Sequence, residues 1–337
     1  MLWRKIQGAG GTGGLNMGGF MNSTTYTGND SGGRAITTGI DLSTGEGMIW
    51  VAARNANSNN PEKPICDTNM GATNFLLTSN ADAIETSAQA LQSFDATGFT
   101  IGTSIDYNED TTAFVAWTFK SEPGVFDCLE YTGTGAAQDI THALGEVPGA
   151  IITKTQSGDG GDDNWNMYHR SLNGGTTPED YFVEVGKNNR NEEFDTSTWN
   201  STAPTSSVFS VGASDDTNVS GDTYSAYIFP HNDNVQCGTY TGNGSLTGPT
   251  VTLGFEPQWL FIKGADLGVP KRGLVWDNAR NPSNPRTDAS VAWQRAVDLV
   301  AVYDVDFNAT GFQVKNNRSE VNKTGDTYVY IAIRKAD

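Results

Sequence analysis

The residues best suited to chemistry lie in one polar stretch, Ser-Gly-Asp-Gly-Gly-Asp-Asp-Asn-Trp at 157–165. Its oxygen-bearing side chains are Asp159, Asp162, Asp163 and Asn164. Carboxylate and amide oxygens are the ligands that a hard cation such as Ca²⁺ prefers. Their spacing matches no EF-hand loop, and a solvated acidic turn would have the same composition. The stretch is therefore a calcium candidate, with a plain surface turn as the alternative.

The other residue types that carry chemistry lack the spacing that a catalytic or metal site needs. His142, His169 and His231 stand far apart in the chain, outside any motif with metal-ligand spacing. The glycines of Gly-Ala-Gly-Gly-Thr-Gly at 8–13 resemble a dinucleotide loop, but no strand pattern precedes them and no helix pattern follows. We therefore assign no catalytic residue and no cofactor, and we expect a protein without enzymatic activity.

The number and spacing of the cysteines limit which disulfide and metal-binding frameworks are possible. Cys66, Cys128 and Cys237 are odd in number and have no Cys-x-x-Cys spacing. This pattern argues against a disulfide framework and against a zinc site. We expect three buried free thiols.

Charge and hydropathy exclude two classes of partner. The 337 residues include 39 acidic and 21 basic side chains, for a formal net charge of −18. Nucleic-acid binding depends on clustered Lys and Arg, so no nucleic-acid partner is expected. The sequence has no apolar run of membrane-spanning length, so no membrane insertion is expected. Its N-terminus has glycine where a secretory signal has an apolar stretch, which indicates assembly in a cytoplasm.

The chain repeats itself. Tyr-Thr-Gly-Thr-Gly begins a stretch at Tyr131 that aligns without gaps with a second stretch from Tyr240, a spacing of 109 residues. Gly-Asp-Thr-Tyr closes both copies, at 221–224 and 325–328. A divergent third copy begins at Tyr26. Self-similarity of this length usually reports the architecture.

Short apolar runs rich in Val, Ile, Trp, Tyr and Phe, bounded by turn residues, predict an all-β protein. We expect three tandem antiparallel repeats that resemble a β-sandwich or jelly roll, and a Gly-rich N-terminal arm. The expected boundaries are 1–25 for the arm and 26–127, 128–234 and 235–337 for the repeats. In the last strand, Tyr328, Tyr330 and Ala332 should face one way and Val329, Ile331 and Ile333 the other. Because both faces are apolar, a neighbouring repeat or chain should cover the second face.

Two shorter patterns give local predictions. Phe-Asp-Ala-Thr-Gly-Phe at 94–99 and Phe-Asn-Ala-Thr-Gly-Phe at 307–312 are typical of a hairpin or bulge. Exposed tryptophans could stack on sugar rings, and the candidates are Trp165, Trp199, Trp259, Trp276 and Trp293. Trp259 and Trp276 lie in apolar strand patterns and should be in the core. Trp199 lies in a polar stretch, and we expect it to be exposed.

These motifs resemble a tandem repeat found in virion structural proteins of tailed bacteriophages, particularly marine ones, labelled tail-fibre-like or tail-appendage proteins. The second copy matches best, at Tyr131, Thr132, Gly133, His142, Leu144, Gly145, Val147, Pro148, Gly149, Trp165, Tyr168, His169, Asn218, Gly221, Tyr224 and Ala226. The third copy keeps the opening and the closing, and the first keeps little more than its Tyr-Thr-Gly, its turn and its closing strand. This divergence favours a retained scaffold with specialised surfaces over a site repeated three times.

The resemblance implies a non-enzymatic virion component, a tail fibre or tail appendage that contacts the host. A capsid-bound fibre or decoration protein is the first alternative. A carbohydrate-binding module or capsule depolymerase is the second, and exposed aromatics with an acidic pair in a groove would favour it. The expected partners are other virion proteins, further copies of the chain in a homo-oligomer, with a trimer as the guess, and a host surface glycan.

Overall fold

The computed structural model describes residues 16–55, 61–157, 164–185, 192–265, 272–292 and 297–336. The protein is all-β, as predicted from the sequence. The two α-helices of the described part have four residues each, and none of its helices is long and apolar enough to cross a membrane.

The first segment, residues 21–120, follows a short 3-10 turn. Its six-stranded antiparallel sheet has the order β1-β9-β3-β4-β5-β6, and a second layer has the order β2-β8-β7. The elements are η1 (Met17–Gly19), β1 (Met21–Thr27), β2 (Arg34–Thr37), β3 (Gly47–Ala53), β4 (Pro64–Asp67), β5 (Asn74–Leu77), β6 (Glu85–Thr86), β7 (Leu91–Asp95), β8 (Gly98–Ile101), α1 (Ile105–Asn108) and β9 (Ala113–Lys120).

The second segment, residues 127–230, has a six-stranded sheet of order β10-β17-β12-β13-β14-β15 and a two-stranded layer of β11 and β16. The elements are β10 (Asp127–Thr132), β11 (Gln138–Thr141), β12 (Pro148–Thr155), β13 (Asn166–His169), η2 (Leu172–Gly175), η3 (Pro178–Asp180), β14 (Tyr181–Glu184), β15 (Glu192–Phe194), β16 (Val208–Val211) and β17 (Thr223–Pro230).

The third segment, residues 235–334, joins both layers in one sheet of order β18-β25-β20-β21-β22-β23-β24-β19. The layers are continuous because the long strand β23 pairs with β22 at one end and with β24 at the other. The elements are β18 (Val235–Thr241), β19 (Thr250–Thr252), β20 (Pro257–Gly264), β21 (Leu274–Asp277), β22 (Arg286–Val291), β23 (Leu299–Asn308), β24 (Gly311–Val314), α2 (Ser319–Asn322) and β25 (Thr327–Arg334).

The three segments use the same order of pairing. In each, the last strand lies between the first and the third strand, and all pairs are antiparallel. The register also recurs, because β12–β17 and β20–β25 both shift after their first residue pair, at Pro148 and at Pro257. Equivalent positions in the three segments can therefore be read from the strand registers.

Two kinds of core follow from the two apolar faces of each main sheet. One face packs against the second layer of its own segment, which gives three separate cores. The other face contributes to a single core shared by all three segments. The prediction for the last strand is confirmed: Tyr328, Tyr330 and Ala332 lie in the third segment's own core, whereas Val329, Ile331 and Ile333 lie in the shared core. A neighbouring segment of the same chain therefore covers the second face.

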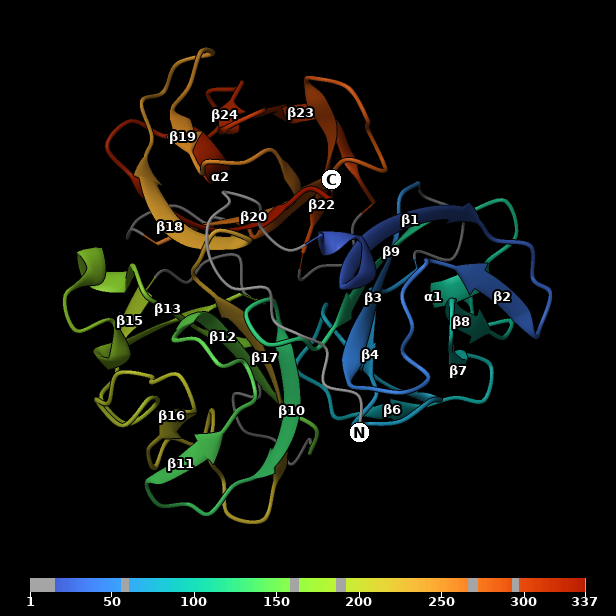
Figure 1. The fold of residues 1–337 in the computed structure, drawn as a ribbon, viewed down its shortest axis with the longest axis horizontal. Coiled ribbons are helices and arrows are strands. Elements are labelled where there is room, and N and C mark those ends of the chain that lie inside the picture. The colour runs from blue at the N-terminus through green and yellow to red at the C-terminus, as the bar shows by residue number, and fades with distance from the viewer. Residues whose placement is uncertain are drawn as a thin grey trace.

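The segments form a closed ring, seen as three lobes around a common centre in Figure 1. A backbone hydrogen bond at each boundary joins one segment to the residue that follows the third strand of the next. These bonds run from the Ile84 amide to the Gln156 carbonyl (2.9 Å), from Glu192 to Ala265 (3.0 Å) and from Asp298 to Arg54 (3.2 Å). The third bond returns from the third segment to the first, so the ring closes within one chain.

The predicted hairpins at Ala-Thr-Gly-Phe are confirmed. Asp95 pairs with Gly98, and Asn308 pairs with Gly311. A Cβ on Gly98 would lie 2.0 Å from the Ile36 carbonyl oxygen, and one on Gly311 would lie 1.9 Å from the equivalent oxygen of Val251. Only glycine allows the neighbouring strand to approach this closely.

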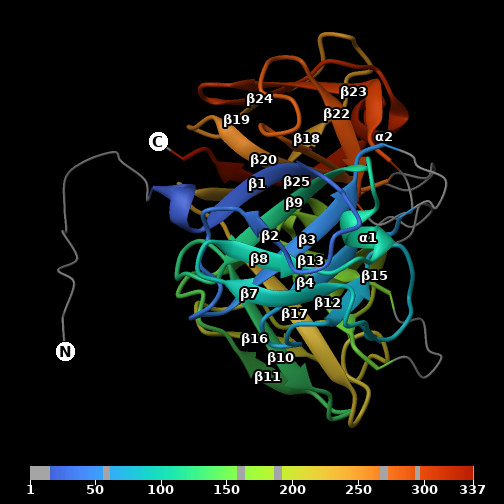
Figure 2. The ribbon, with the colours of Figure 1, turned by 90° about the vertical axis from the view of Figure 1, so that its right-hand side faces the viewer.

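The predicted arm at 1–25 extends too far into the fold. Residues 1–15 lie outside the described part of the chain, but residues 16–25 form η1 and most of β1. Met17 and Met21 are fully buried in the shared core, because their apolar side chains can fill it despite the surrounding glycines. A side chain on Gly18 would contact Ala336, so the two ends of the described chain meet. Figure 2 shows both ends on the same side of the ring.

Candidate functional site

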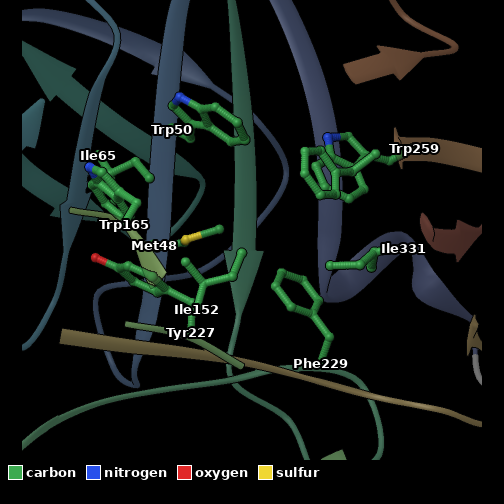
Figure 3. A pocket seen from close by; sticks show the side chains of 10 residues that line it. Met48, Trp50, Ile65, Ile152, Trp165, Tyr227, Phe229, Trp259 and Ile331 are labelled. Atoms are coloured by element: carbon green, nitrogen blue, oxygen red, sulfur yellow. The ribbon is translucent and has the colours of Figure 1, made fainter. Parts of the chain in front are cut away.

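The centre of the ring contains a small apolar cavity of about 20 Å³. Each segment contributes side chains to its wall, among them Met48 and Trp50, Ile152 and Phe229, and Trp259 and Ile331 (Figure 3). A space of this size is close to that of one water molecule, and an apolar cavity has no partners to hold a water. The cavity is therefore a packing gap between three sheets and is too small for a ligand.

Polar side chains cross the boundaries at one equivalent position. The strand registers align Asp67, His169 and Asp277, which pair with Met48, Ala150 and Trp259, respectively. Each residue ends the fourth strand of its main sheet and bonds to the last strand of the next segment. The aligned position therefore forms a ring of three polar contacts around the shared core.

The Asp67 carboxylate bonds the first segment to the second. Its Oδ2 accepts hydrogen bonds from the Tyr227 hydroxyl (2.8 Å) and the Ser225 hydroxyl (3.3 Å). The amides of Asn69 and Met70 donate to Oδ1. Burial raises the pKa of Asp67, and these hydrogen bonds reduce that rise. The carboxylate is fully engaged in joining two sheets.

His169 bonds the second segment to the third as a neutral imidazole. Its Nε2 donates to the carbonyl of Tyr330 at 3.1 Å, and its Nδ1 accepts from the Ser171 amide at 3.2 Å. The amide can only donate, so the ring proton lies on Nε2. Burial lowers the pKa of His169 to about 4, since no carboxylate compensates for the lost solvation.

Asp277 bonds the third segment to the first within a buried ion network. Its Oδ2 accepts from Trp117 Nε1 (2.9 Å) and from Arg280 Nε (2.6 Å). Arg280 also reaches Asp298 at 2.7 Å and lies over the Trp117 ring. Burial alone would raise the pKa of Asp277, but the Arg280 guanidinium and the hydrogen bonds outweigh it and hold the pKa below its usual range. The pairing keeps two charges in the interior.

A large open hollow lies at the boundary between the second and third segments, with a volume of about 810 Å³. The second segment contributes Asn173, Tyr181, Glu192, Glu193 and Phe194. The third contributes Ala265, which follows β20, and Gly325 and Asp326, which precede β25. The hollow therefore combines an aromatic pair with carboxylates from both segments. This combination can bind a ligand that has an apolar face and hydrogen-bond donors.

The aromatic pair belongs to the outermost two strands of the second sheet. Tyr181 and Phe194 are directly paired across β14 and β15. Their rings meet edge to face, with centroids 5.4 Å apart and planes at 70°. Tyr181 is half-buried against the shared core, whereas Phe194 is 66% exposed. Tyr181 thus contacts one edge of an exposed aromatic ring.

The carboxylates around the pair are held in place by hydrogen bonds and ion pairs. Glu192 Oε2 accepts from the Asn173 amide at 2.7 Å. Asp326 forms an ion pair with Lys323 at 3.2 Å. The Glu192 amide makes the boundary bond to Ala265, which fixes β15 against the third segment. The wall of the hollow is therefore built from both segments and depends on their relative placement.

The structure places the residues of the predicted calcium candidate and the three cysteines as follows. Asp159, Asp162 and Asp163 lie outside the described residues, whereas Asn164 is buried and its Nδ2 donates to Glu184 Oε1 at 3.0 Å. No group of three or more His, Cys, Asp or Glu that could hold a metal ion occurs within the described ranges. The three cysteines are buried free thiols, as predicted.

The prediction that Trp199 is exposed was wrong. Trp199 is 2% exposed and packs edge to face against Tyr168 and Phe209 in the second segment's own core. The surrounding polar side chains serve the turn, where Asp195 accepts from Ser197 and Thr198, and the indole points inward. Trp259 and Trp276 are in the core as predicted, Trp165 is buried in the shared core, and Trp293 lies outside the described residues.

The sequence reasoning missed Phe194. A single large apolar residue within Glu-Glu-Phe-Asp at 192–195 was the available signal. Its pairing with Tyr181 could not be foreseen without the register of β14 and β15.

A family model described as "Domain of unknown function (DUF7483)" matches residues 16–336. The chain belongs to this family. The one DUF7483 match spans all three segments. A search of curated proteins finds no match to the chain.

Proposed function

We propose that this DUF7483 protein is a non-enzymatic structural component of a tailed-phage virion, located at a tail fibre or tail appendage that contacts the host. One geometric observation carries the proposal. The ends of the described chain meet at one side of the ring, and β15, whose residues line the hollow, lies towards the other side (Figure 2). A protein held at one end and free at the other has the polarity of an attachment module.

The packing supports a structural role. The three segments are joined by a shared apolar core, by backbone bonds at every boundary and by buried polar side chains. The contacts of Asp67, His169 and Asp277 all serve to hold neighbouring segments together. A single rigid body can transmit force between a particle and a surface, because its segments do not swing independently.

The Gly-rich residues before Asn16 would attach the ring to other virion proteins. The described chain begins next to Ala336, on the side of the ring away from β15 (Figure 2). Glycine-rich chain has no core of its own and can be moulded onto a partner surface. The homo-oligomer predicted from the sequence would have to form through this end or through the outer surfaces, because the inner sheet faces are already covered within one chain.

The test is to locate the protein in particles of the phage that encodes it. Mass spectrometry of purified particles should detect the chain at a stoichiometry above one per virion, and a cryo-EM reconstruction should show the three-lobed ring on the tail with its hollow facing outward. Density on the capsid instead would replace the tail assignment with the decoration alternative. Recovery of the protein only as a soluble product of infected cells would refute the virion role.

A further inference from the structure

We propose that the hollow lined by Tyr181, Phe194, Glu192, Glu193 and Asp326 is a glycan-binding site for pyranose sugars that carry no acidic groups. The proposal rests on the proposed function, because it assigns the recognition site of the attachment module. It is argued from the three features of the hollow that follow.

The first feature is an exposed aromatic ring. Phe194 keeps 66% of its surface exposed inside a concave region. Its ring contacts the half-buried Tyr181 edge to face. A rigid flat ring loses little conformational entropy on binding, and its face matches the C–H face of a pyranose.

The second feature is the set of hydrogen-bonding groups around that ring. Glu192, Glu193, Asp326 and Asn173 line the same hollow, and Glu192 shares the face of β15 with Phe194 whereas the Glu193 side chain takes the opposite face. Ionised carboxylates only accept hydrogen bonds, so they match the hydroxyl donors of a sugar. The same charges, in a chain of net charge −18, repel uronic acids and phosphorylated sugars. The ligand is therefore a glycan without acidic groups.

The third feature is that, among the residues that the structure describes, the aromatic pair occurs at only one of the three equivalent boundaries, although Val300 is also exposed (60%). The register aligns Phe194 with Thr86 of the first segment and with Val300 of the third. At the first boundary, the Thr86 hydroxyl donates a hydrogen bond to the side chain of its strand partner Asn74 at 2.8 Å. At the third, the strand partner of Val300 is Asp288, which forms an ion pair with Arg54 at 3.2 Å. The scaffold repeats, whereas the aromatic pair does not. A purely architectural role would not require an exposed aromatic at one boundary alone.

The hollow is large enough for an oligosaccharide. Small-molecule sites typically enclose ~300–1,000 Å³, and this one has about 810 Å³. It crosses a segment boundary, where the backbone bond from Glu192 to Ala265 holds the two walls together. Binding sites commonly occur at such junctions because each wall is set by a rigid element.

The experiment uses the full chain on an array of bacterial surface oligosaccharides in three groups: uncharged, amine-bearing and anionic. Binding to the uncharged or amine-bearing group is expected, with the anionic group empty. Phe194→Ala should lower the affinity about tenfold or more, because it removes the apolar platform. Glu192→Gln should weaken binding by a smaller factor, since the amide keeps one acceptor and Glu192 shares the face of β15 with Phe194.

Leu246→Ala is the matched control, because Leu246 is 65% exposed, lies in the third segment's β18–β19 connection and is not among the residues that line the hollow. It should bind as the parent does, and the melting temperatures of the variants should agree. An empty array, binding confined to anionic glycans, or equal affinities for the parent and Phe194→Ala would each overturn the glycan site. If the chain is found in particles but the array is empty, the glycan site is refuted and the virion role is not. If the chain is absent from particles but binds glycans in a Phe194-dependent way, the virion role is refuted and the glycan site is not.

Discussion

Acidification should loosen the boundary between the second and third segments through His169. This imidazole has a folded pKa of about 4 against an ordinary value of 6.5. Between these values the unfolded chain binds a proton that the folded chain does not bind, so stability increases with pH. The His169 contribution is therefore fully present above pH 6.5 and is lost as the pH falls towards 4.

The magnitude follows from the same difference. Each pH unit in this window costs ~1.4 kcal/mol in the free energy of unfolding, and the complete loss is about 3 kcal/mol. The structural cause is specific, because a proton on Nδ1 would face the Ser171 amide, which is itself a donor. Protonation would remove one hydrogen bond and leave a charge in the interior.

The assay is denaturant unfolding, followed by tryptophan fluorescence, at several pH values from 7 to 4, for the parent and for His169→Gln. Other titrating groups act in both proteins and cancel when the two pH profiles are subtracted. The difference should grow by about 3 kcal/mol across the window. The control His231→Gln should keep most of the His169 slope, since His231 is half-buried, accepts from the Cys237 amide of β18 and makes the smallest of the contributions that lower the His169 pKa. Parallel profiles for the parent and His169→Gln would refute the reasoning.

Three further predictions concern stability. Asp277→Ala should lower the free energy of unfolding by ~3–5 kcal/mol, because it leaves Arg280 with less compensation in the interior, and a denaturant titration that gives under 1 kcal/mol would contradict the buried network. Gly311→Ala should lower the free energy of unfolding by about 2–3 kcal/mol, because its Cβ would overlap a strand carbonyl. Gly19→Ala, with open space around it, should leave the stability unchanged, and thermal melts of both variants measure the difference. The isolated piece 127–230 should fail to fold or should associate, because the sheet face that packs in the shared core would be exposed. The intact chain should unfold in one calorimetric transition. A stable monomeric piece would show that the segments are independent.

Local patterns in the sequence were sufficient for the all-β class, the hairpins and the two apolar faces of the last strand. Strand alternation has a period of two residues, so Tyr328 and Val329 take opposite faces whatever surrounds them. The turn at Gly98 was equally local, since it depends on one residue without a Cβ. The inference that both faces of the main sheet must be covered also came from this alternation.

The tertiary structure alone decided which surfaces meet. Trp199 was misassigned because its neighbours in sequence are polar, while its neighbours in space are Tyr168 and Phe209. The bond between Trp117 and Asp277 joins residues 160 positions apart, so no local spacing could reveal it. Phe194 lies next to Tyr181 only because of one strand register, and it lines one hollow with Asp326 only because the second and third segments pack together. Alternation along a strand is a short-range property of the backbone, whereas a site between segments depends on long-range packing that brings distant residues together.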